Sequence, residues 1–396
     1  MVANPSYIGN IEEHFRPTHD ERARQKFASV IRKNAIIDLR QAMEADWKQR
    51  VEPALRARGV TVGHWRDIQA AMENRASYRF YSAIRYNAQE MCYLSVQPTV
   101  ERALPRMIQT AREARRARAA GGSLRLNPQL ELPRYLTALD THLAPGWTHS
   151  EFTVDDVAQG AVVEFGGKVF TGLHPYRHFR GVVAQSIGEW LKRAYPAFKP
   201  RRMLDIGTTS GNNLFPYLSI YPGIEAHGVD AAAPVLRFGH AVAERAGLTV
   251  HFSQQNAEAM DFPDGHFDLI VSSFFFHEIP LKATQRVLRE CRRLLAPGGH
   301  MVHMELPNEA AVDAYANFFW NWDTANNNEP FYTNFREQDP VELCVAAGFH
   351  RQKCFAHLIP DFASFGEQKF SAWLRGEVAA PNHGAGGWFV FGVHDA

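Results

Sequence analysis

The sequence predicts an α/β fold: a doubly wound, mostly parallel sheet of seven strands with a helical N-terminal domain. Two observations predict it. From about residue 176 onwards, short apolar runs alternate with helical segments, a pattern typical of a parallel sheet with helices on both faces. Before about residue 150, apolar residues recur instead at helical spacing. The 396 residues leave room for two to three domains.

The first expected unit, residues 1–150, is mainly helical. Helical spacing begins after Asp20 and ends at Gly59, and a second stretch runs from about His64 to Leu104, with an aromatic cluster near Tyr81. We expect this unit to cap the rest of the chain or to form a contact between two copies. Residues 151–175 form the second unit: two β-rich runs around Gly166-Gly167 predict a β-hairpin connector.

The third expected unit, residues 176–396, carries the sheet. A helix over 176–198 precedes five expected strands separated mostly by helices, notably those over 234–246 and 284–295. Two further strands without a clear helix between them predict an antiparallel edge. The expected strands are 203–207, 224–230, 249–255, 267–273, 300–306, 352–359 and 388–393.

Composition excludes several classes of protein. Apolar residues make up 45% and charged residues 21%, the mix of an ordinary globular protein. No segment approaches the roughly 18 apolar residues of a membrane span, and no signal peptide is visible. The four cysteines form no CxxC pair, which suits a reducing compartment. We therefore expect a soluble, cytoplasmic protein.

Charge is unevenly distributed although the net charge is +1. Residues 1–150 carry +8 and residues 151–396 carry −7. Much of the positive excess lies in the arginine-rich run 112–118. Such a run can bind nucleic acid, but a solvated helix end is the favoured interpretation, and no other nucleic-acid motif is present.

The expected ligand site lies where the strands end, at the carboxyl edge of the sheet. Gly207 and Gly211 follow the first strand and permit a tight turn onto a helix N-terminus. Asp230 ends the second strand, where a carboxylate can accept both ribose hydroxyls. The dinucleotide fingerprint GxGxxG is absent, and Asp205 would repel a pyrophosphate. A ribose-bearing ligand with a cationic amino group fits these residues.

These segments resemble the class I S-adenosylmethionine-dependent methyltransferases, with motifs similar to those of the ubiquinone/menaquinone methyltransferases. Five motifs occur in the expected order from the first strand to Pro297-Gly298-Gly299. The resemblance implies S-adenosylmethionine as cofactor and assigns it a set of binding residues. They are the glycine-rich loop around the methionyl portion (Asp205, Gly207, Thr208 and Gly211), the ribose-binding Asp230, the adenine turn (Asn256 and Ala257), and Ser273 near the methyl group.

The acceptor pocket of this family begins just past the fourth strand, where His277 and Glu278 lie. A histidine there can act as a base near neutral pH, whereas it can equally cap a helix or fill the pocket rim. Further candidates for acceptor binding are more distant in the sequence. They are Tyr86 in the helical domain, Glu305 at the end of the fifth strand, Trp320, and Arg336, for which a surface position is the alternative.

No metal site is predicted. The 18 histidines include no HxxxH or HExxH spacing that we expect on one helix. His300 and His303 are three residues apart on an expected strand and so face opposite sides.

The sequence thus predicts methyl transfer to a small metabolite, with oxygen the favoured acceptor atom, in specialised metabolism. Three alternatives remain: a protein that binds S-adenosylmethionine without methyl transfer, a methyltransferase whose macromolecular substrate docks on the basic N-terminal helices, and a nicotinamide-linked dehydrogenase. The expected partners are a small-molecule acceptor and a second copy bound through the N-terminal helices, with no membrane and no nucleic acid.

Overall fold

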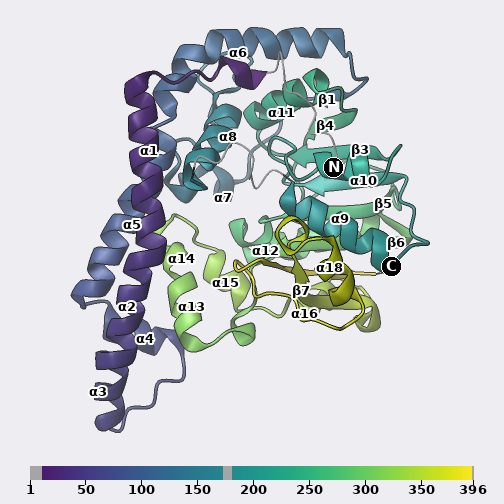
Figure 1. Cartoon of the computed structure of the whole chain (residues 1–396). Helices are drawn as coiled ribbons and strands as arrows, with labels where there is room; N and C mark the ends of the chain where they lie inside the picture. The colour runs from purple at the N-terminus through teal and green to yellow at the C-terminus, as the bar shows by residue number, and fades with distance from the viewer. Residues whose placement is uncertain (1–10, 173–180, 395–396) are drawn as a thin grey trace.

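The computed structural model describes residues 11–172 and 181–394. Its centre is one sheet, whose strands in sequence order are β1 (Ser123–Arg125), β2 (Arg202–Ile206), β3 (Glu225–Asp230), β4 (Val250–Gln254), β5 (Phe267–Ser273), β6 (Leu295–Glu305), β7 (Cys354–Pro360) and β8 (Gly387–Val393). Their spatial order is β1-β4-β3-β2-β5-β6-β8-β7 (Figure 1). Strands β1 to β6 pair in parallel, and β8 lies antiparallel between β6 and β7. The predicted α/β class and antiparallel edge are confirmed.

The predicted count of seven strands is wrong, because the described part of the chain contributes eight. The additional strand, β1, comes from the N-terminal part and pairs in parallel with β4. The hydroxyl of Thr249 donates to the carbonyl of Ala120 at 2.6 Å, just before this strand. Three residues are too few to produce a readable alternation of apolar and polar side chains.

Both faces of the sheet are buried, as a doubly wound arrangement requires. Successive residues of β2 point to opposite sides: Met203 packs with α9 and α10, and Leu204 packs with α12 and α16. The helices of this part are α9 (Val182–Ala194), α10 (Phe215–Ile220), α11 (Ala233–Arg245), α12 (Leu281–Leu294), α16 (Pro340–Ala346), α17 (Phe362–Phe365) and α18 (Glu367–Leu374).

Two expectations for these helices need correction. Helices α17 and α18 occupy the connection between β7 and β8, where no clear helix was expected. The predicted helix over 176–198 is described only as α9, because residues 176–180 lie outside the described residues. Helix α9 ends at Ala194, ahead of Pro196 and Pro200.

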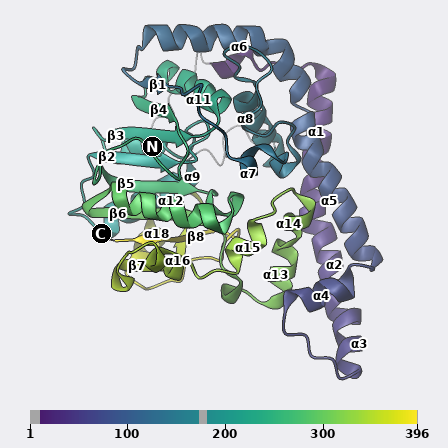
Figure 2. The ribbon, with the colours of Figure 1, turned by 180° about the vertical axis from the view of Figure 1, so that it is seen from behind.

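The N-terminal part is helical, as predicted. Helices α1 (His19–Asn34), α2 (Arg40–Asp46) and α5 (Ala76–Leu94) stand in a column beside the sheet, whereas α6 (Gln97–Ala117), the longest, runs across the top of the molecule (Figures 1 and 2). Its α-helices are α1 (His19–Asn34), α2 (Arg40–Asp46), α3 (Glu52–Ala57), α4 (Trp65–Met72), α5 (Ala76–Leu94), α6 (Gln97–Ala117) and α7 (Arg134–Thr137). Two π-helical turns, η2 (Ala35–Leu39) and η3 (Trp47–Val51), join α1, α2 and α3. The arginine-rich run forms the end of α6, where Arg112 pairs with Asp155 at 2.7 Å.

The predicted hairpin around Gly166-Gly167 is wrong, because this segment is helix α8 (Ala158–Phe170). Its glycines serve close packing rather than a turn. A Cβ on Gly160 would lie 2.3 Å from Cβ of Phe238 in α11, and one on Gly166 would lie 2.5 Å from the ring of Tyr93 in α5. Helix α8 therefore joins the helical column to the sheet-bearing part through one apolar cluster.

A segment after β6 packs against the helical column. It contains α13 (Ala314–Trp320), α14 (Trp322–Asn326) and α15 (Tyr332–Arg336). The indole N–H of Trp322 donates to the hydroxyl of Ser82 at 2.8 Å, and Arg85 binds both carboxylate oxygens of Asp323 at 2.7 and 2.8 Å. The column and this segment are therefore fastened together by polar contacts as well as by aromatic packing.

Five short 3-10 helices complete the described structure. They are η1 (Ile11–His14), η4 (Thr141–Leu143), η5 (Phe276–Glu278), η6 (Glu309–Ala311) and η7 (Arg351–Lys353). Among the residues described, no helix has both the length and the apolar character needed to cross a membrane.

Candidate active site

The loop after β2 is built around a buried carboxylate. Asp205 is 2% exposed, and its Oδ2 accepts a hydrogen bond from the hydroxyl of Thr208 at 2.7 Å. Gly207 and Gly211 have φ values of +65° and +82°, which a residue with a Cβ rarely adopts. The turn predicted from these glycines is therefore present, and it places Thr208 and Asp205 together beneath the loop.

The loops after β2 and β3 are linked through Asp230. Its Oδ2 accepts the backbone N–H of Thr209 at 3.0 Å, and its Oδ1 accepts that of Ala232 at 2.9 Å. Burial raises the pKa of Asp230 to about 6, although these N–H groups oppose the shift. Burial and the nearby Asp230 charge also raise the pKa of Asp205 to about 7, against the Thr208 hydrogen bond. The two acids thus lie near each other at the carboxyl edge of the sheet, Asp205 buried and Asp230 partly exposed.

In the turn after β4, the side-chain amide of Asn256 forms a hydrogen bond within the turn itself. The Oδ1 of Asn256 accepts the backbone N–H of Glu258 at 3.0 Å, so this amide caps the turn. Ala257, like Phe262 and Phe275, packs against the apolar cluster that contains Leu204 and Ile206. The hydroxyl of Tyr135, next to the first residue of α7, donates to Glu258 at 2.8 Å. The helical N-terminal part therefore also reaches this turn.

The end of β5 leads directly into a buried histidine–carboxylate pair. Ser273 closes β5, and η5 then carries His277, which is 3% exposed. Its Nδ1 donates to Oε2 of Glu305 at 2.6 Å. Oε1 of Glu305 also accepts the backbone N–H groups of Phe275 and Phe276 at 2.7 and 2.6 Å. Glu305 is thus a positioning residue that fixes η5 and the orientation of His277.

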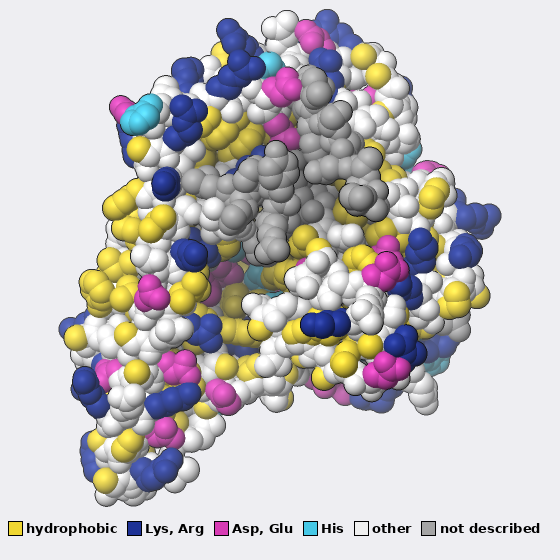
Figure 3. Space-filling model, in the orientation of Figure 1, with side chains coloured by type: hydrophobic (Ala, Val, Ile, Leu, Met, Phe, Trp, Pro, Cys, Tyr) yellow, Lys and Arg dark blue, Asp and Glu magenta, His cyan; other side chains and the backbone are white. Residues whose placement is uncertain are grey.

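A second histidine meets this group from the N-terminal part. His142 belongs to η4, and its Nε2 lies 3.0 Å from Oε1 of Glu278. Its Nδ1 lies 3.0 Å from Oε1 of Glu329, a residue between α14 and α15. We call His142, His277, Glu278, Glu305 and Glu329 the His/Glu cluster. Figure 3 shows a hollow between the helical column and the sheet-bearing part, in which acidic and histidine side chains are visible.

The charges of the His/Glu cluster shift one another's pKa. Burial alone would lower the pKa of each histidine, but the facing carboxylates outweigh burial and raise the pKa of His142 and His277 well above the ordinary value. Burial raises the pKa of Glu329, against the opposing effect of His142. For Glu278, the two histidines outweigh burial and lower its pKa to about 2.

Sequence reasoning found only part of this cluster. It placed His277, Glu278 and Glu305 near the acceptor, and the structure brings all three together. It did not name His142 or Glu329 as part of the site. No short spacing relates positions 142 and 329 to residues 277 and 278, so no local pattern could have identified His142 and Glu329.

Three other candidates for acceptor binding lie apart from the His/Glu cluster or have their polar groups engaged. Arg336 is completely buried rather than at the surface, and it donates to Pro307 O, Asn321 Oδ1 and Asn317 Oδ1 at 3.0, 2.6 and 2.6 Å. It therefore braces the segment after β6. The ring of Trp320 lies over this guanidinium, 4.9 Å from its Cζ. Tyr86 is 39% exposed, whereas the side chain of the preceding Arg85 is only 12% exposed.

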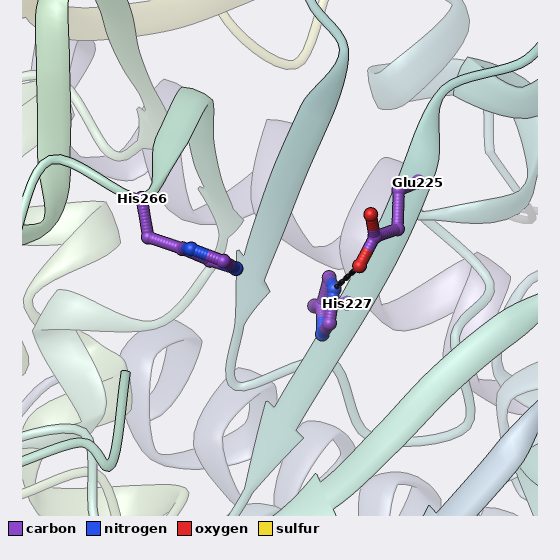
Figure 4. A group of neighbouring side chains, drawn as sticks. All are labelled: Glu225, His227 and His266. Atoms are coloured by element: carbon purple, nitrogen blue, oxygen red, sulfur yellow. Dashed lines mark hydrogen bonds and ion pairs between the residues drawn. The ribbon is translucent and has the colours of Figure 1, made fainter. Parts of the chain in front are cut away.

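A second group of side chains with potential metal-ligand atoms lies at the amino ends of the strands, opposite the candidate active site (Figure 4). Glu225 and His227 come from the amino end of β3, whereas Asp230 comes from its carboxyl end. His227 Nε2 lies 2.8 Å from Glu225 Oε1, and His266 faces the pair from the turn before β5. This group does not belong to the candidate active site.

Comparisons with known proteins support the assignment of the sheet-bearing part. Residues 203–299 match the family described as "Methyltransferase domain". The demethylmenaquinone methyltransferase of Thermus thermophilus is 38% identical over 108 residues, which cover 27% of this chain and 48% of that protein. The ubiquinone/menaquinone biosynthesis C-methyltransferase UbiE of Vibrio vulnificus is 32% identical over 126 residues, covering 29% of this chain and 47% of that protein.

The chain spans about half the length of these relatives. A solved structure of a putative O-methyltransferase from Nostoc punctiforme superposes with a TM-score of 0.40 and 16% identity, covering 62% of this chain and 63% of that one. The match over 203–299 covers β2 to the start of β6, including the loops that hold Asp205 and Asp230. The sheet-bearing part of this chain therefore contains a methyltransferase domain of the class I S-adenosylmethionine-dependent type.

Proposed function

We propose that the protein transfers a methyl group from S-adenosylmethionine to a small-molecule acceptor, and that the acceptor atom is an oxygen. One observation carries the proposal. The first two strands of the matched domain carry Asp205, which is buried, and Asp230 at their carboxyl ends, and its β5 leads into the His/Glu cluster. A site suited to a cationic nucleoside and a site suited to proton transfer thus lie at the same edge of the sheet.

The residues after β2 and β3 fit S-adenosylmethionine. Within the described part of the chain, neither Asp205 nor Asp230 forms an ion pair, so both acids can accept positive or hydrogen-bond-donating groups from a ligand. Ser210 Oγ and Asn213 Oδ1, on the same loop, are buried without a hydrogen-bond partner there. Asp205 suits an ammonium group and Asp230 suits ribose hydroxyls.

When bound, S-adenosylmethionine supplies a methyl group whose bond to sulfur breaks, with the electron pair remaining on sulfur, as a lone pair of the acceptor forms the new bond. The protein must hold the acceptor atom about 3 to 3.5 Å from that methyl group and in line with the breaking bond. The segment containing α13 to α15, fastened to the helical column by the Arg85–Asp323 pair, supplies a rigid wall for this purpose. The same wall limits access of water.

An oxygen acceptor fits the His/Glu cluster. A hydroxyl must lose its proton as the new bond forms, and carboxylates and imidazoles are the side chains that accept protons near neutral pH. The relatives named above are a demethylmenaquinone methyltransferase and a C-methyltransferase. Three members of the cluster, His142, Glu305 and Glu329, lie outside the residues that match the family. The acceptor end is thus built largely by this chain's own additional segments.

The decisive experiment is calorimetric titration of the full chain with S-adenosylhomocysteine, with NAD as the control ligand. We expect saturable binding of S-adenosylhomocysteine and none of NAD. Binding of NAD alone would contradict the proposed cofactor.

A second experiment tests methyl transfer. The protein is incubated with S-adenosylmethionine labelled in the methyl group and with panels of hydroxyl-, amine- and thiol-bearing small molecules. We expect label in hydroxyl compounds, at a rate that changes little between 50 and 200 mM salt. Activity only on nucleic acid, falling steeply over this range, would contradict a small-molecule acceptor.

A further inference from the structure

The His/Glu cluster has the composition of a metal site as well as that of a proton-transfer site. Ligand atoms of His142, Glu278 and Glu329 all lie within 4.8 Å of one another. Two ligands held about 2.1 Å from one ion are separated by about 3.0 to 4.2 Å, depending on their angle. The three side chains therefore need only small rotations to ligate one cation.

The orientation of His277 strengthens this interpretation. Glu305 holds its Nδ1 at 2.6 Å, so its Nε2 faces Glu278 Oε1 at 3.5 Å and Glu329 Oε2 at 3.8 Å. These distances are long for hydrogen bonds but suit neighbouring ligands of one ion. A histidine that donates one ring nitrogen to a carboxylate and presents the other is the usual arrangement of a metal-binding imidazole.

The charge and polar groups around the cluster point the same way. Glu305 and Glu329 are 0% and 3% exposed, and buried carboxylates are unfavourable without compensating positive charge. Asn327 is 5% exposed, and its Nδ2 contacts both Glu329 and His142 Nδ1, the latter at 3.1 Å. Its amide oxygen is buried and has no hydrogen-bond partner among the residues the structure describes. An unsatisfied polar atom therefore adjoins the proposed ligands.

We propose that His142, Glu278 and Glu329 bind a divalent first-row transition-metal ion, with His277 as a fourth ligand held in place by Glu305. Mixed imidazole and carboxylate ligands suit ions such as Mn²⁺, Fe²⁺, Co²⁺ or Zn²⁺. The role of this ion, though not its binding, rests on the proposed function. At the acceptor end the ion binds the acceptor's hydroxyl oxygen and eases its ionisation. The O–H bond breaks, the proton passes to a carboxylate oxygen of the cluster that does not ligate the ion, and the oxygen lone pair attacks the methyl group.

The group at the opposite edge provides a comparison within the same molecule. Glu225, His227 and His266 also offer ligand atoms within 4.8 Å of one another (Figure 4). However, Arg202 Nη1 lies 3.4 Å from His266 Nδ1, and the Glu225 side chain is 49% exposed. A guanidinium beside a ligand atom opposes a cation, so this group serves as a control rather than as a second proposed site.

The test uses the metal alone. The full chain, stripped with a chelator, is titrated with Co²⁺ in the absence of S-adenosylmethionine, with visible absorption and calorimetry as readouts. We expect one equivalent to bind and to give ligand-field bands. Glu329→Gln and Glu278→Gln each weaken binding at least tenfold, whereas His227→Gln leaves it unchanged. Each variant's thermal melting is measured first, and Glu278→Gln decides if Glu329→Gln unfolds.

Two outcomes overturn the proposal: no binding of Co²⁺, Mn²⁺ or Zn²⁺ by the stripped wild-type chain, or binding that His227→Gln removes and Glu278→Gln retains. Titration of the same samples with S-adenosylhomocysteine separates the two proposals. Metal binding without S-adenosylhomocysteine binding contradicts the proposed function and supports the metal site. S-adenosylhomocysteine binding without metal binding overturns the metal site alone.

Discussion

The cofactor end and the acceptor end of the candidate active site are built in different ways. At the cofactor end, each acid lies at or next to the last residue of its own strand: Asp205 is next to last in β2, and Asp230 ends β3. At the acceptor end, side chains from η4, η5, β6 and the segment before α15 meet in one cluster. The first is held by backbone groups of neighbouring loops, and the second is held by ion pairs between distant segments.

This difference indicates which side-chain substitutions each end tolerates without loss of stability. Asp230 is oriented by two backbone N–H groups, which remain in place when the side chain is replaced. A cofactor-end variant should therefore lose ligand contacts while the fold survives. At the acceptor end, each side chain is the partner of another buried charge. Removing one leaves its partner unpaired, so stability should change first.

The largest expected effect is on stability and follows from Glu305→Ala. This change removes the acceptor for His277 Nδ1 and for the N–H groups of Phe275 and Phe276. We expect the free energy of unfolding to fall by about 3 to 5 kcal/mol, because a buried imidazolium loses its partner. Urea unfolding measures it. Glu225→Ala, at a half-exposed carboxylate, is the control, and an unchanged midpoint for Glu305→Ala would show that Glu305 does not brace η5.

Next in size is the loss of cofactor affinity in Asp230→Ala. We expect the free energy of S-adenosylhomocysteine binding to weaken by about 1 to 3 kcal/mol, because hydrogen bonds to a charged group are lost. Calorimetric titration gives the value. Asp268→Asn is the matched control, since Asp268 accepts the N–H groups of Arg201 and Arg202 in the same sheet. Equal affinity in Asp230→Ala and wild type would refute the assignment of the ribose.

The pH dependence of binding sharpens the comparison further. Burial raises the pKa of Asp205 to about 7, so this carboxylate takes up a proton as the pH falls from 8 to 6. We expect affinity for S-adenosylhomocysteine to fall by about tenfold over this range, because the neutral acid no longer attracts the ligand's ammonium group. Asp205→Asn should bind weakly at both pH values. A wild-type affinity independent of pH would contradict the assignment.

The same pKa shift acts on the ligand-free protein in the opposite direction. The folded-state pKa of Asp205 lies above its ordinary value near 3.8, so the folded state binds this proton more tightly than the unfolded state does. Its contribution to stability is present below about pH 4 and is lost as the pH rises towards 7. Comparing the urea midpoints of wild type and Asp205→Asn across this range isolates the contribution.

The smallest expected effect follows from Arg85→Lys. Arg85 binds both oxygens of Asp323, and a lysine cannot reproduce this two-pronged contact. We expect a loss of about 1 kcal/mol in the free energy of unfolding, because the pair is only 12% exposed on each side. Thermal melting measures it. Arg66→Lys, in an exposed pair with Glu337, should change stability much less, and equal losses would show that burial does not matter here.

Much of the sheet could be predicted because its signals are local. The predicted strand 267–273 has the same bounds as β5, and the helices over 234–246 and 284–295 agree with α11 and α12 within a few residues. Each of these elements is buried against the sheet, so its apolar periodicity is plain. Local signals failed in α8, because glycine is common both in turns and where helices pack closely. Gly160 and Gly166 permit close helix packing there, and the predicted hairpin turn is absent.

Arg336 shows the other kind of failure. An isolated arginine in a sequence reads as a solvated surface residue, because a buried guanidinium is unfavourable without partners. Here three acceptors, Pro307 O, Asn321 Oδ1 and Asn317 Oδ1, satisfy it in the interior. Those partners lie 15 to 29 residues away, and nothing in their spacing indicates that they converge on one side chain.

The sequence by itself determined the α/β class and the positions of the main strands along the chain, and it predicted the two acids at the ends of β2 and β3, because each depends on residues adjacent along the chain. Only the tertiary structure decided the acceptor end. His142 reaches Glu278 and Glu329 because η4 and the segment after β6 are both held against the sheet edge by the helical column. Charged residues so far apart in the sequence are brought together only by the packing of the elements that carry them, and this packing produces no regular spacing in the sequence.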